Sequence, residues 1–107
     1  MSRIIALGHY QPSRVLTNDD LAKLVDTSDE WIRDRVGIVT RRIADTETVA
    51  DMAAAAAEKA LANSGLTAAD IDLVVVATCS AVDRSPNTAC RVAARLGIDA
   101  PGAYDIN

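Results

Sequence analysis

Residues Ile71 to Thr78 read Ile-Asp-Leu-Val-Val-Val-Ala-Thr, and the four consecutive residues from Leu73 to Val76 are aliphatic, three of them β-branched. A strand with one face in water alternates apolar and polar residues, whereas an unbroken valine-rich run is typical of a parallel sheet covered by helices on both faces. We therefore predict a strand that is buried on both faces. The rest of the chain is expected to supply its cover.

The segments on either side of this strand are predicted to be helices. Residues 47–64 place apolar side chains at helical spacing, and Gly65 follows as a stop signal. Residues 87–96 form a second helix, preceded by Pro86, which suits a first helical position, and ended by Gly97. The expected buried faces are Val49, Met52, Ala53, Ala56 and Ala60 in the first helix and Ala89, Val92, Ala93 and Leu96 in the second.

Shorter elements are predicted around this helix–strand–helix core from cap residues, breakers and alternation. In chain order they are a first strand at Ile4 to Tyr10, a helix capped by Thr17-Asn18 and running through Val25, a helix capped by Thr27-Ser28 and stopped by Gly37, an edge strand or extended loop at Ile38 to Ile43, a capped turn at Thr67 to Asp70, and a last strand at Gly102 to Ile106.

This order of elements predicts an α/β fold with a parallel sheet and crossover helices. Crossovers of this kind are right-handed in about 98% of cases, so both long helices should lie on the same face of the sheet. The other face of the strand at residues 71–78 is then left without cover. We infer that residues 1–107 are part of one larger domain, whose missing layer comes from a partner chain or from more of the same protein.

Composition excludes several classes of function. The 107 residues are 50% hydrophobic, and their formal charge of −4 gives no general attraction for nucleic acid or an anionic membrane. No stretch resembles a signal peptide or approaches the roughly 20 apolar residues of a membrane span, so we expect a cytoplasmic protein. Cys79 and Cys90 lack the spacing of a zinc site or a disulfide framework and are expected to be free thiols.

A few residues are candidates for chemistry. Trp31 and Arg35 are four apart on one helix face, with Arg41 and Arg42 nearby, and a flat indole with forked guanidinium donors suits a nucleotide-like ligand. The alternative, a Trp packed under its helix beside solvated arginines, is favoured by the residues alone. Structural roles are also expected for the lone histidine, both cysteines and two aspartates that flank the central strand, namely His9, Cys79, Cys90, Asp70 and Asp72.

One series of motifs points to a known family. Thr27-Ser28-Asp29-Glu30-Trp31-Ile32, followed by Arg35, Gly37-Ile38 and Arg41, resembles the signature of β-ketoacyl-acyl-carrier-protein synthase III, a thiolase-superfamily condensing enzyme. The match continues in order through Gly8-x-Tyr10-x-Pro12, Thr17-Asn18-x-Asp20-Leu21, Ile71-Asp72-Leu73, Ala77-Thr78, Pro86-x-x-Ala89-Cys90, Leu96-Gly97 and Tyr104-Asp105-Ile106-Asn107.

The resemblance implies a layered α-β-α-β-α fold, of which this chain is part of the N-terminal half, and a homodimer. It also implies decarboxylative condensation of an acyl-CoA primer with malonyl-acyl-carrier protein, with acyl-CoA as a substrate and no cofactor or metal. The family's nucleophilic cysteine lies just past the Asp-Ile-Asn segment. Neither Cys79 nor Cys90 matches it, and His9 does not match the catalytic histidine, so no catalytic residue is expected in this chain.

The residues that carry over from the family belong to substrate binding. Trp31 matches the Trp that stacks on the adenine of coenzyme A, Arg35 matches the Arg near the nucleotide phosphates, and Thr27 is a neighbour of that site. The resemblance thus reverses the structural interpretation of Trp31 and Arg35. Before Pro86, many members carry a Phe that closes the acyl pocket of the partner subunit, and this chain has Ser85.

Two other functions remain open at this point. A starter-unit ketosynthase or an acyltransferase of polyketide or other secondary metabolism would share the fold. A non-catalytic subunit that dimerises or binds CoA would share the fold without the nucleophile.

Overall fold

The computed structural model describes residues 1–99 and 102–107. Contacts between Cα atoms divide the chain into two compact units. The larger unit consists of Met1–Tyr10 with Glu47–Asn107, and the smaller unit consists of Gln11–Thr46. The prediction that residues 1–107 belong to one larger domain stays a prediction. No helix among the described residues has both the length and the apolar character needed to cross a membrane.

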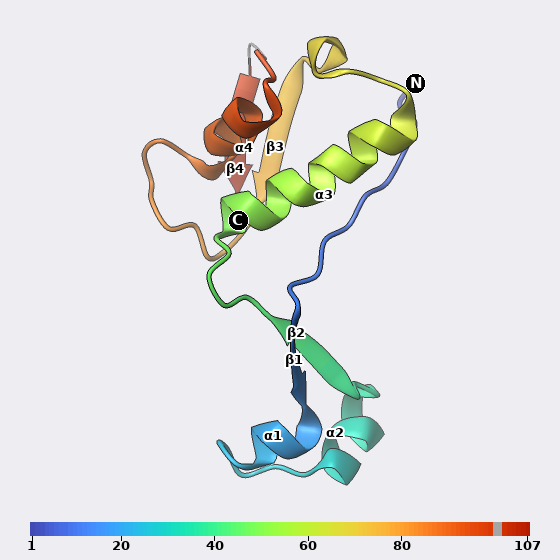
Figure 1. Ribbon diagram of the computed structural model, residues 1–107, viewed down its shortest axis with the longest axis vertical. Helices are drawn as coiled ribbons and strands as arrows, with labels where there is room; N and C mark the ends of the chain where they lie inside the picture. Colours follow the sequence, from blue (N-terminus) through green and yellow to red (C-terminus); the bar gives the residue numbers. More distant parts are fainter. Residues whose placement is uncertain (100–101) are drawn as a thin grey trace. The chain divides into compact units, whose positions relative to one another are not determined.

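The larger unit is built around two parallel strands. β3 pairs with β4 from Leu73 opposite Gly102 to Ala77 opposite Ile106, and the connection between the two strands contains α4, as the crossover prediction required (Figure 1). The elements of this unit are α3 (Val49–Ser64), the 3₁₀ turn η1 (Ala68–Asp70), β3 (Leu73–Ala77), α4 (Thr88–Leu96) and β4 (Gly102–Ile106).

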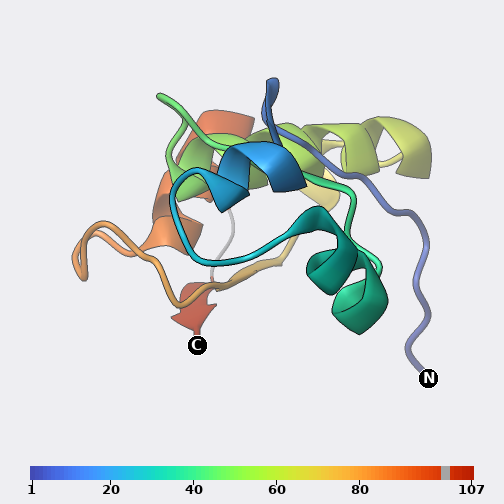
Figure 2. The same cartoon turned by 90° about the horizontal axis from the view of Figure 1, so that it is seen from below.

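Both long helices pack on one side of the strand pair (Figure 2). Their alanines and Val92 form the buried core with Val76 of β3. Side chains alternate along a strand, so Leu73 and Val75 point to the opposite side, where they remain 50% and 43% exposed. The prediction of burial on both faces is therefore wrong within this chain, because both helices cover the same face. The expected uncovered second face is confirmed.

The helix boundaries follow their caps. Thr48 and Asp51 form a capping box at the start of α3, and Gly65 ends the helix at φ +74°. α4 begins one residue later than predicted, because the side chain of Asn87 accepts from the Cys90 N–H and so makes Asn87 the N-cap. Pro86 lies before that cap and is not the first helical residue, which corrects the prediction.

The buried stripe of α3 was predicted only in part. Ala50 and Ala54 are the buried core residues of this helix, and neither belongs to the predicted set, whereas Ala53 of that set is partly buried and packs against the core. Eight of the sixteen helical residues are alanines, which fill most positions from 53 to 62 and carry little periodic contrast. In α4, where larger residues mark the face, Ala89, Val92 and Ala93 are buried as predicted and Leu96 is partly buried.

The predicted first strand at Ile4–Tyr10 is not a strand in the structure. This segment lies against α3 instead of pairing with β3. Gly8 approaches the helix so closely that a Cβ atom there would lie 2.3 Å from the carbonyl oxygen of Ala56 and 2.4 Å from the amide nitrogen of Ala60. Asn63 Nδ2 donates to the carbonyl oxygen of Leu7. The segment is apolar enough for a strand, but Leu7 and Gly8 at its centre contact α3.

The smaller unit consists of a strand pair and two short helices. β1 (Arg14–Thr17) pairs with β2 (Thr40–Ile43) in antiparallel fashion, and α1 (Asn18–Ala22) and α2 (Asp29–Val36) lie between them in the chain. β2 shows that residues 40–43 of the segment predicted as a strand or loop are a strand, while residues 38 and 39 lie outside it. β1 was not predicted, because its sequence is short and half polar. The predicted caps Thr17 and Ser28 and the stop at Gly37 are confirmed, while α1 ends at Ala22, before the predicted Val25.

Candidate functional site

The candidate nucleotide site lies at the start of α2. The Ser28 hydroxyl accepts a hydrogen bond from the Trp31 N–H at 3.1 Å, which caps the helix. The indole of Trp31 is 57% exposed, and it lines a shallow hollow together with Asp26, Thr27 and Ser28. The structure thus brings predicted residues Thr27 and Trp31 to one hollow, with an apolar ring beside two hydroxyl groups.

Arg35 lies one helical turn beyond Trp31. Its guanidinium carbon is 5.7 Å from the centroid of the indole ring, a cation–π distance. Arg35 and Trp31 are both exposed, so the Trp is not packed under its helix as the structural alternative required. A flat apolar surface and a forked cation therefore lie side by side in solvent, which is the arrangement that a base and its phosphates need.

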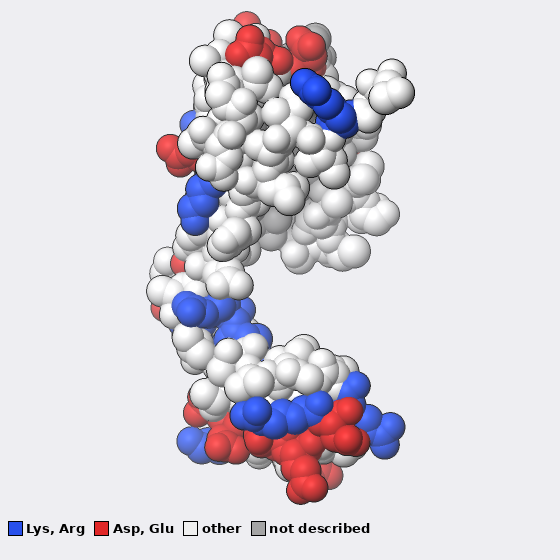
Figure 3. Space-filling view, turned by 90° about the vertical axis from the view of Figure 1, so that its right-hand side faces the viewer, with Lys and Arg blue, Asp and Glu red and all other residues white. Residues whose placement is uncertain are grey.

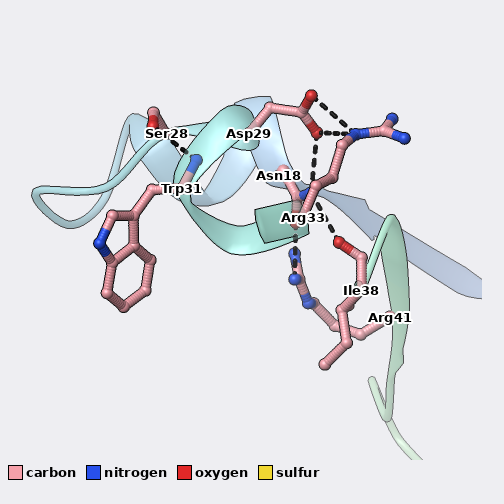
Figure 4. A network of polar contacts seen from close by, with 7 residues as sticks. All are labelled: Asn18, Ser28, Asp29, Trp31, Arg33, Ile38 and Arg41. Carbon is pink, nitrogen blue, oxygen red and sulfur yellow. Dashed lines mark hydrogen bonds and ion pairs between the residues drawn. The ribbon is translucent and has the colours of Figure 1, made fainter. Parts of the chain in front are cut away.

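A buried network holds α2 in place (Figure 4). Asn18, which is 1% exposed, donates through Nδ2 to Asp29 Oδ1 and to the carbonyl oxygen of Ile38, both at 2.8 Å. Its Oδ1 accepts from Arg41 Nη2 at 2.7 Å. Asp29 also accepts from Arg33 Nε at 2.8 Å. One amide thus joins the start of α1 to the start of α2 and to the segment that leads into β2, while Trp31 points away from the network (Figure 4).

The network shifts the ionisation of Asp29. The Asn18 amide, with a smaller contribution from the Arg33 guanidinium, lowers the pKa of this carboxyl group, because both donors favour the charged form. Sequence reasoning missed Asn18, since an Asn beside a capping Thr gives no sign that its side chain turns inward.

The other two arginines of the basic cluster have structural partners. Arg41 is engaged by Asn18, and Arg42 Nη1 donates to the carbonyl oxygens of Pro12 and Ser13 at 3.2 and 3.3 Å. Figure 3 shows basic and acidic side chains lying next to each other over the smaller unit. Of the four residues first considered for nucleotide binding, Trp31, Arg35 and Arg42 are exposed, and the Arg42 guanidinium is engaged by the two backbone carbonyls.

Ser85, the predicted acyl-pocket residue, lies in the larger unit on the exposed loop between β3 and α4. At the start of this loop, the Ser80 N–H donates a hydrogen bond to Thr78 Oγ1 at 3.1 Å. At its end, the Asn87 side chain caps α4. Asp83 and Arg91 form an ion pair across the loop at 2.7 Å.

The remaining candidates do not assemble a reactive centre. His9 and both thiols are exposed, and the two cysteines are free as predicted. Among residues 1–99 and 102–107, no group of three His, Cys, Asp or Glu side chains could hold a metal ion. Asp70 forms a capping box with Thr67, as expected of a turn residue.

A carboxylate at the end of β4 was also missed. Asp105 accepts from the backbone N–H groups of Thr88 and Ala89 at 2.8 and 2.7 Å, which joins β4 to the first turn of α4. Partial desolvation opposes ionisation, but these two donors prevail and lower the pKa of Asp105. The Asp in the Tyr104-Asp105-Ile106 motif thus joins β4 to α4, and its two donors lie 17 and 16 residues away in the chain, which the sequence pattern does not reveal.

Comparison with known proteins gives a consistent result, although no protein-family model matches the chain. Over 107 residues the chain is 70% identical to β-ketoacyl-acyl-carrier-protein synthase III 4 of Streptomyces coelicolor, and the aligned region covers 99% of this chain and 34% of that protein. The chain therefore spans about a third of the length of the curated relatives that it matches.

Solved structures agree in fold. The crystal structure of 3-oxoacyl-acyl-carrier-protein synthase III from Aquifex aeolicus is 49% identical with a TM-score of 0.92, covering 97% of this chain and 34% of the other. A priming β-ketosynthase of a polyketide biosynthetic pathway is 39% identical, also with a TM-score of 0.92, over 97% of this chain and 31% of the other. The thiolase-like α/β fold expected from the sequence is thereby confirmed.

Proposed function

The chain is related over its whole length to β-ketoacyl-acyl-carrier-protein synthase III, and from this relationship we propose that it is the N-terminal segment of such an enzyme. The enzyme joins an acyl-CoA primer to malonyl-acyl-carrier protein at the start of fatty acid biosynthesis. The observation that carries the proposal is the match along 99% of the chain, at 70% identity, to a protein of that name.

The proposed chemistry has two steps. A cysteine thiolate takes the acyl group from CoA and releases CoA as a thiolate, which takes up a proton from water, and the malonyl group then loses CO₂ to give an enolate that attacks the acyl thioester. The product is a 3-oxoacyl-acyl-carrier protein, and the thiolate is regenerated. The nucleophile and its partners belong to other parts of the enzyme, so residues 1–107 by themselves are expected to be inactive.

Within this scheme the present chain supplies binding residues. Trp31 stacks on the adenine of CoA, Arg35 pairs with its phosphates, and Thr27 lies beside them. This assignment is supported by the exposure of Trp31 and by the 5.7 Å separation of its ring from the Arg35 guanidinium. We further propose a cytoplasmic homodimer that uses acyl-CoA as a substrate, with no cofactor, and in which Ser85 contributes to the partner's acyl pocket.

Trp31→Ala tests the nucleotide site. In the enzyme that contains this chain, we expect acyl-CoA binding to weaken by about 1 to 3 kcal/mol, the range for stacking of a base on an aromatic ring. Arg35→Ala should also weaken binding, and more so at low salt, where phosphate contacts are least screened. Isothermal titration calorimetry measures both effects.

Two control variants sharpen that experiment. Trp31→Phe keeps a flat ring and should recover part of the lost affinity. Arg33→Ala removes an arginine of the same helix that is engaged by Asp29 and should leave Kd nearly unchanged. Equal CoA affinity in wild type, Trp31→Ala and Arg35→Ala would exclude the proposed nucleotide site.

Ser85→Phe tests the acyl pocket. Where many family members carry a Phe ring, the smaller Ser85 side chain leaves space in the acyl pocket. Each CH₂ of a primer that fills this space contributes roughly 0.8 kcal/mol to binding. We expect the native enzyme to use isobutyryl- or hexanoyl-CoA at least as well as acetyl-CoA, and Ser85→Phe to shift it toward acetyl-CoA. Steady-state kcat/KM for the three primers measures the shift, and a native preference for acetyl-CoA that Phe leaves unchanged would rule out this role of Ser85.

A second function in the same fold is favoured by one observation. The polyketide priming β-ketosynthase matches this chain with the same TM-score as the synthase III structure. A starter-unit ketosynthase or acyltransferase of secondary metabolism would perform related acyl transfer with a different carrier protein or acceptor. Comparing kcat/KM for fatty-acid and polyketide carrier proteins separates the two, and a non-catalytic CoA-binding subunit would use neither.

A further inference from the structure

The loop that carries Ser85 is restrained by a single side chain of α4. Arg91 Nη2 donates to Asp83 Oδ2 at 2.7 Å, and Arg91 Nε makes a longer contact of 3.5 Å with the carbonyl oxygen of Pro86. These two partners lie on either side of Ser85 in the sequence. One planar guanidinium therefore restrains the chain before and after the residue proposed to line the acyl pocket.

Both residues of the ion pair also line a small pocket. Its volume is about 80 Å³, and it is lined as well by Val82 of the loop, by Thr88 and Arg95 of α4, and by residues at the start of α3. On the next turn of α4, Arg95 forms an ion pair with Asp51 of α3. The two arginines therefore have different tasks, since Arg95 joins helix to helix and Arg91 joins helix to loop.

From this geometry we propose that Arg91 is a positioning residue for primer selection, acting through Asp83 and Pro86 to fix the place of Ser85. The inference rests on the proposed function of Ser85. The Arg91 and Asp83 side chains are 42% and 49% exposed, so their ion pair adds little to folding and is weakened by salt. Its loss should loosen the loop and change selectivity without unfolding the protein.

The experiment measures kcat/KM of the complete enzyme for acetyl-CoA and hexanoyl-CoA in Arg91→Ala and Asp83→Ala. We expect each variant to change the ratio of kcat/KM for hexanoyl-CoA to kcat/KM for acetyl-CoA by about two- to fivefold, toward equal use of the two primers. This is the range for loss of an exposed ion pair. The change should appear mainly in KM for the primer, with KM for malonyl-acyl-carrier protein unchanged. The double variant should show no larger shift than either single variant, because both remove the same contact.

Matched variants separate positioning from general damage. Arg95→Ala removes the same charge from the same helix, at the same 42% exposure, but has its partner on α3, and should leave the primer ratio unchanged. Arg91→Lys retains a cation for Asp83 but not the forked reach to Pro86, and should give an intermediate ratio. A higher salt concentration should shift the primer ratio of the wild type toward that of Arg91→Ala. The primer ratio of Arg91→Ala itself should change less.

Three results would overturn the inference. If Ser85→Phe shifts primer choice but neither Arg91→Ala nor Asp83→Ala does, the pocket stands and the positioning role is wrong. If Arg91→Ala lowers kcat/KM equally for every substrate, Arg91 only stabilises the fold. If Ser85→Phe itself has no effect, the proposed role of Ser85 fails, and the inference fails with it.

Discussion

Replacing Gly8 by alanine should release the N-terminal segment from α3. The added Cβ would lie 2.3 and 2.4 Å from backbone atoms of Ala56 and Ala60, and helix backbone cannot move aside as a side chain can. Overpacking of this kind costs about 1 to 3 kcal/mol, and here it falls on a close backbone contact. We expect a lower free energy of unfolding in urea and faster amide hydrogen exchange over residues 3–10.

Gly102→Ala is the matched control. Its added Cβ would meet only Cδ1 of Leu73, at 2.7 Å, and that methyl group can move by rotation of its side chain. The expected cost is below about 1 kcal/mol. If Gly8→Ala destabilises the protein no more than Gly102→Ala, and exchange at residues 3–10 is unchanged, the described contact between this segment and α3 is wrong.

Replacing Asn18 by leucine should have the largest effect in the smaller unit. The substitution removes the partner of the Ile38 carbonyl and of the Arg41 guanidinium, and leaves these groups buried or half-buried. An unsatisfied buried polar group costs about 1 to 3 kcal/mol. We expect faster hydrogen exchange across α2 and weaker CoA binding, because α2 carries Trp31.

Two further variants test the network by its chemistry. Asn18→Asp still accepts from Arg41 but cannot donate, and it places a second carboxylate beside Asp29, so it should not rescue the protein. Asn63→Ala removes an exposed amide that donates to Leu7 and should cost less than about 1 kcal/mol. Full stability and unchanged exchange in Asn18→Leu would show that the amide does not organise the unit.

The same network has a pH dependence with a defined sign. Because Asn18 and Arg33 lower the pKa of Asp29 in the folded state, its contribution to stability is present above the ordinary value of 3.8. That contribution is lost as the pH falls below 3.8 and through the lowered folded value. Urea unfolding between pH 3 and 6 should show a weaker acid destabilisation in Asn18→Leu than in wild type, since the first cause of the shift is gone.

The sequence predicted the fold best where only a few residue types can meet a local structural requirement, as at the ends of helices. Thr17 and Ser28 cap helices and Gly65 ends one where predicted, because a short hydroxyl side chain or a glycine satisfies a terminal backbone need that few residues can satisfy. The valine run also gave β3 within one or two residues of its ends.

Prediction failed where a pattern depends on contacts far along the chain. Ile4–Tyr10 has the composition of a strand, but strand formation needs an edge to pair with, and Leu7 and Gly8 of this segment contact α3 instead. The alanine-rich α3 offered no contrast from which to choose a face. At the candidate site, helical spacing was enough to predict that Trp31 and Arg35 lie on one face. The burial of the Asn18 side chain could not be predicted in this way, because it depends on contacts with Ile38 and Arg41, which lie 20 and 23 residues away.

The most direct test of the proposed function is the reaction itself. The enzyme that contains this chain is mixed with an acyl-CoA primer and malonyl-acyl-carrier protein, and mass spectrometry follows the carrier protein while released CoA thiol is assayed. We predict 3-oxoacyl-acyl-carrier protein and CoA in equal amounts, and no product from residues 1–107 alone. A folded enzyme that forms no 3-oxoacyl product with acetyl-, isobutyryl- or hexanoyl-CoA would contradict the proposal.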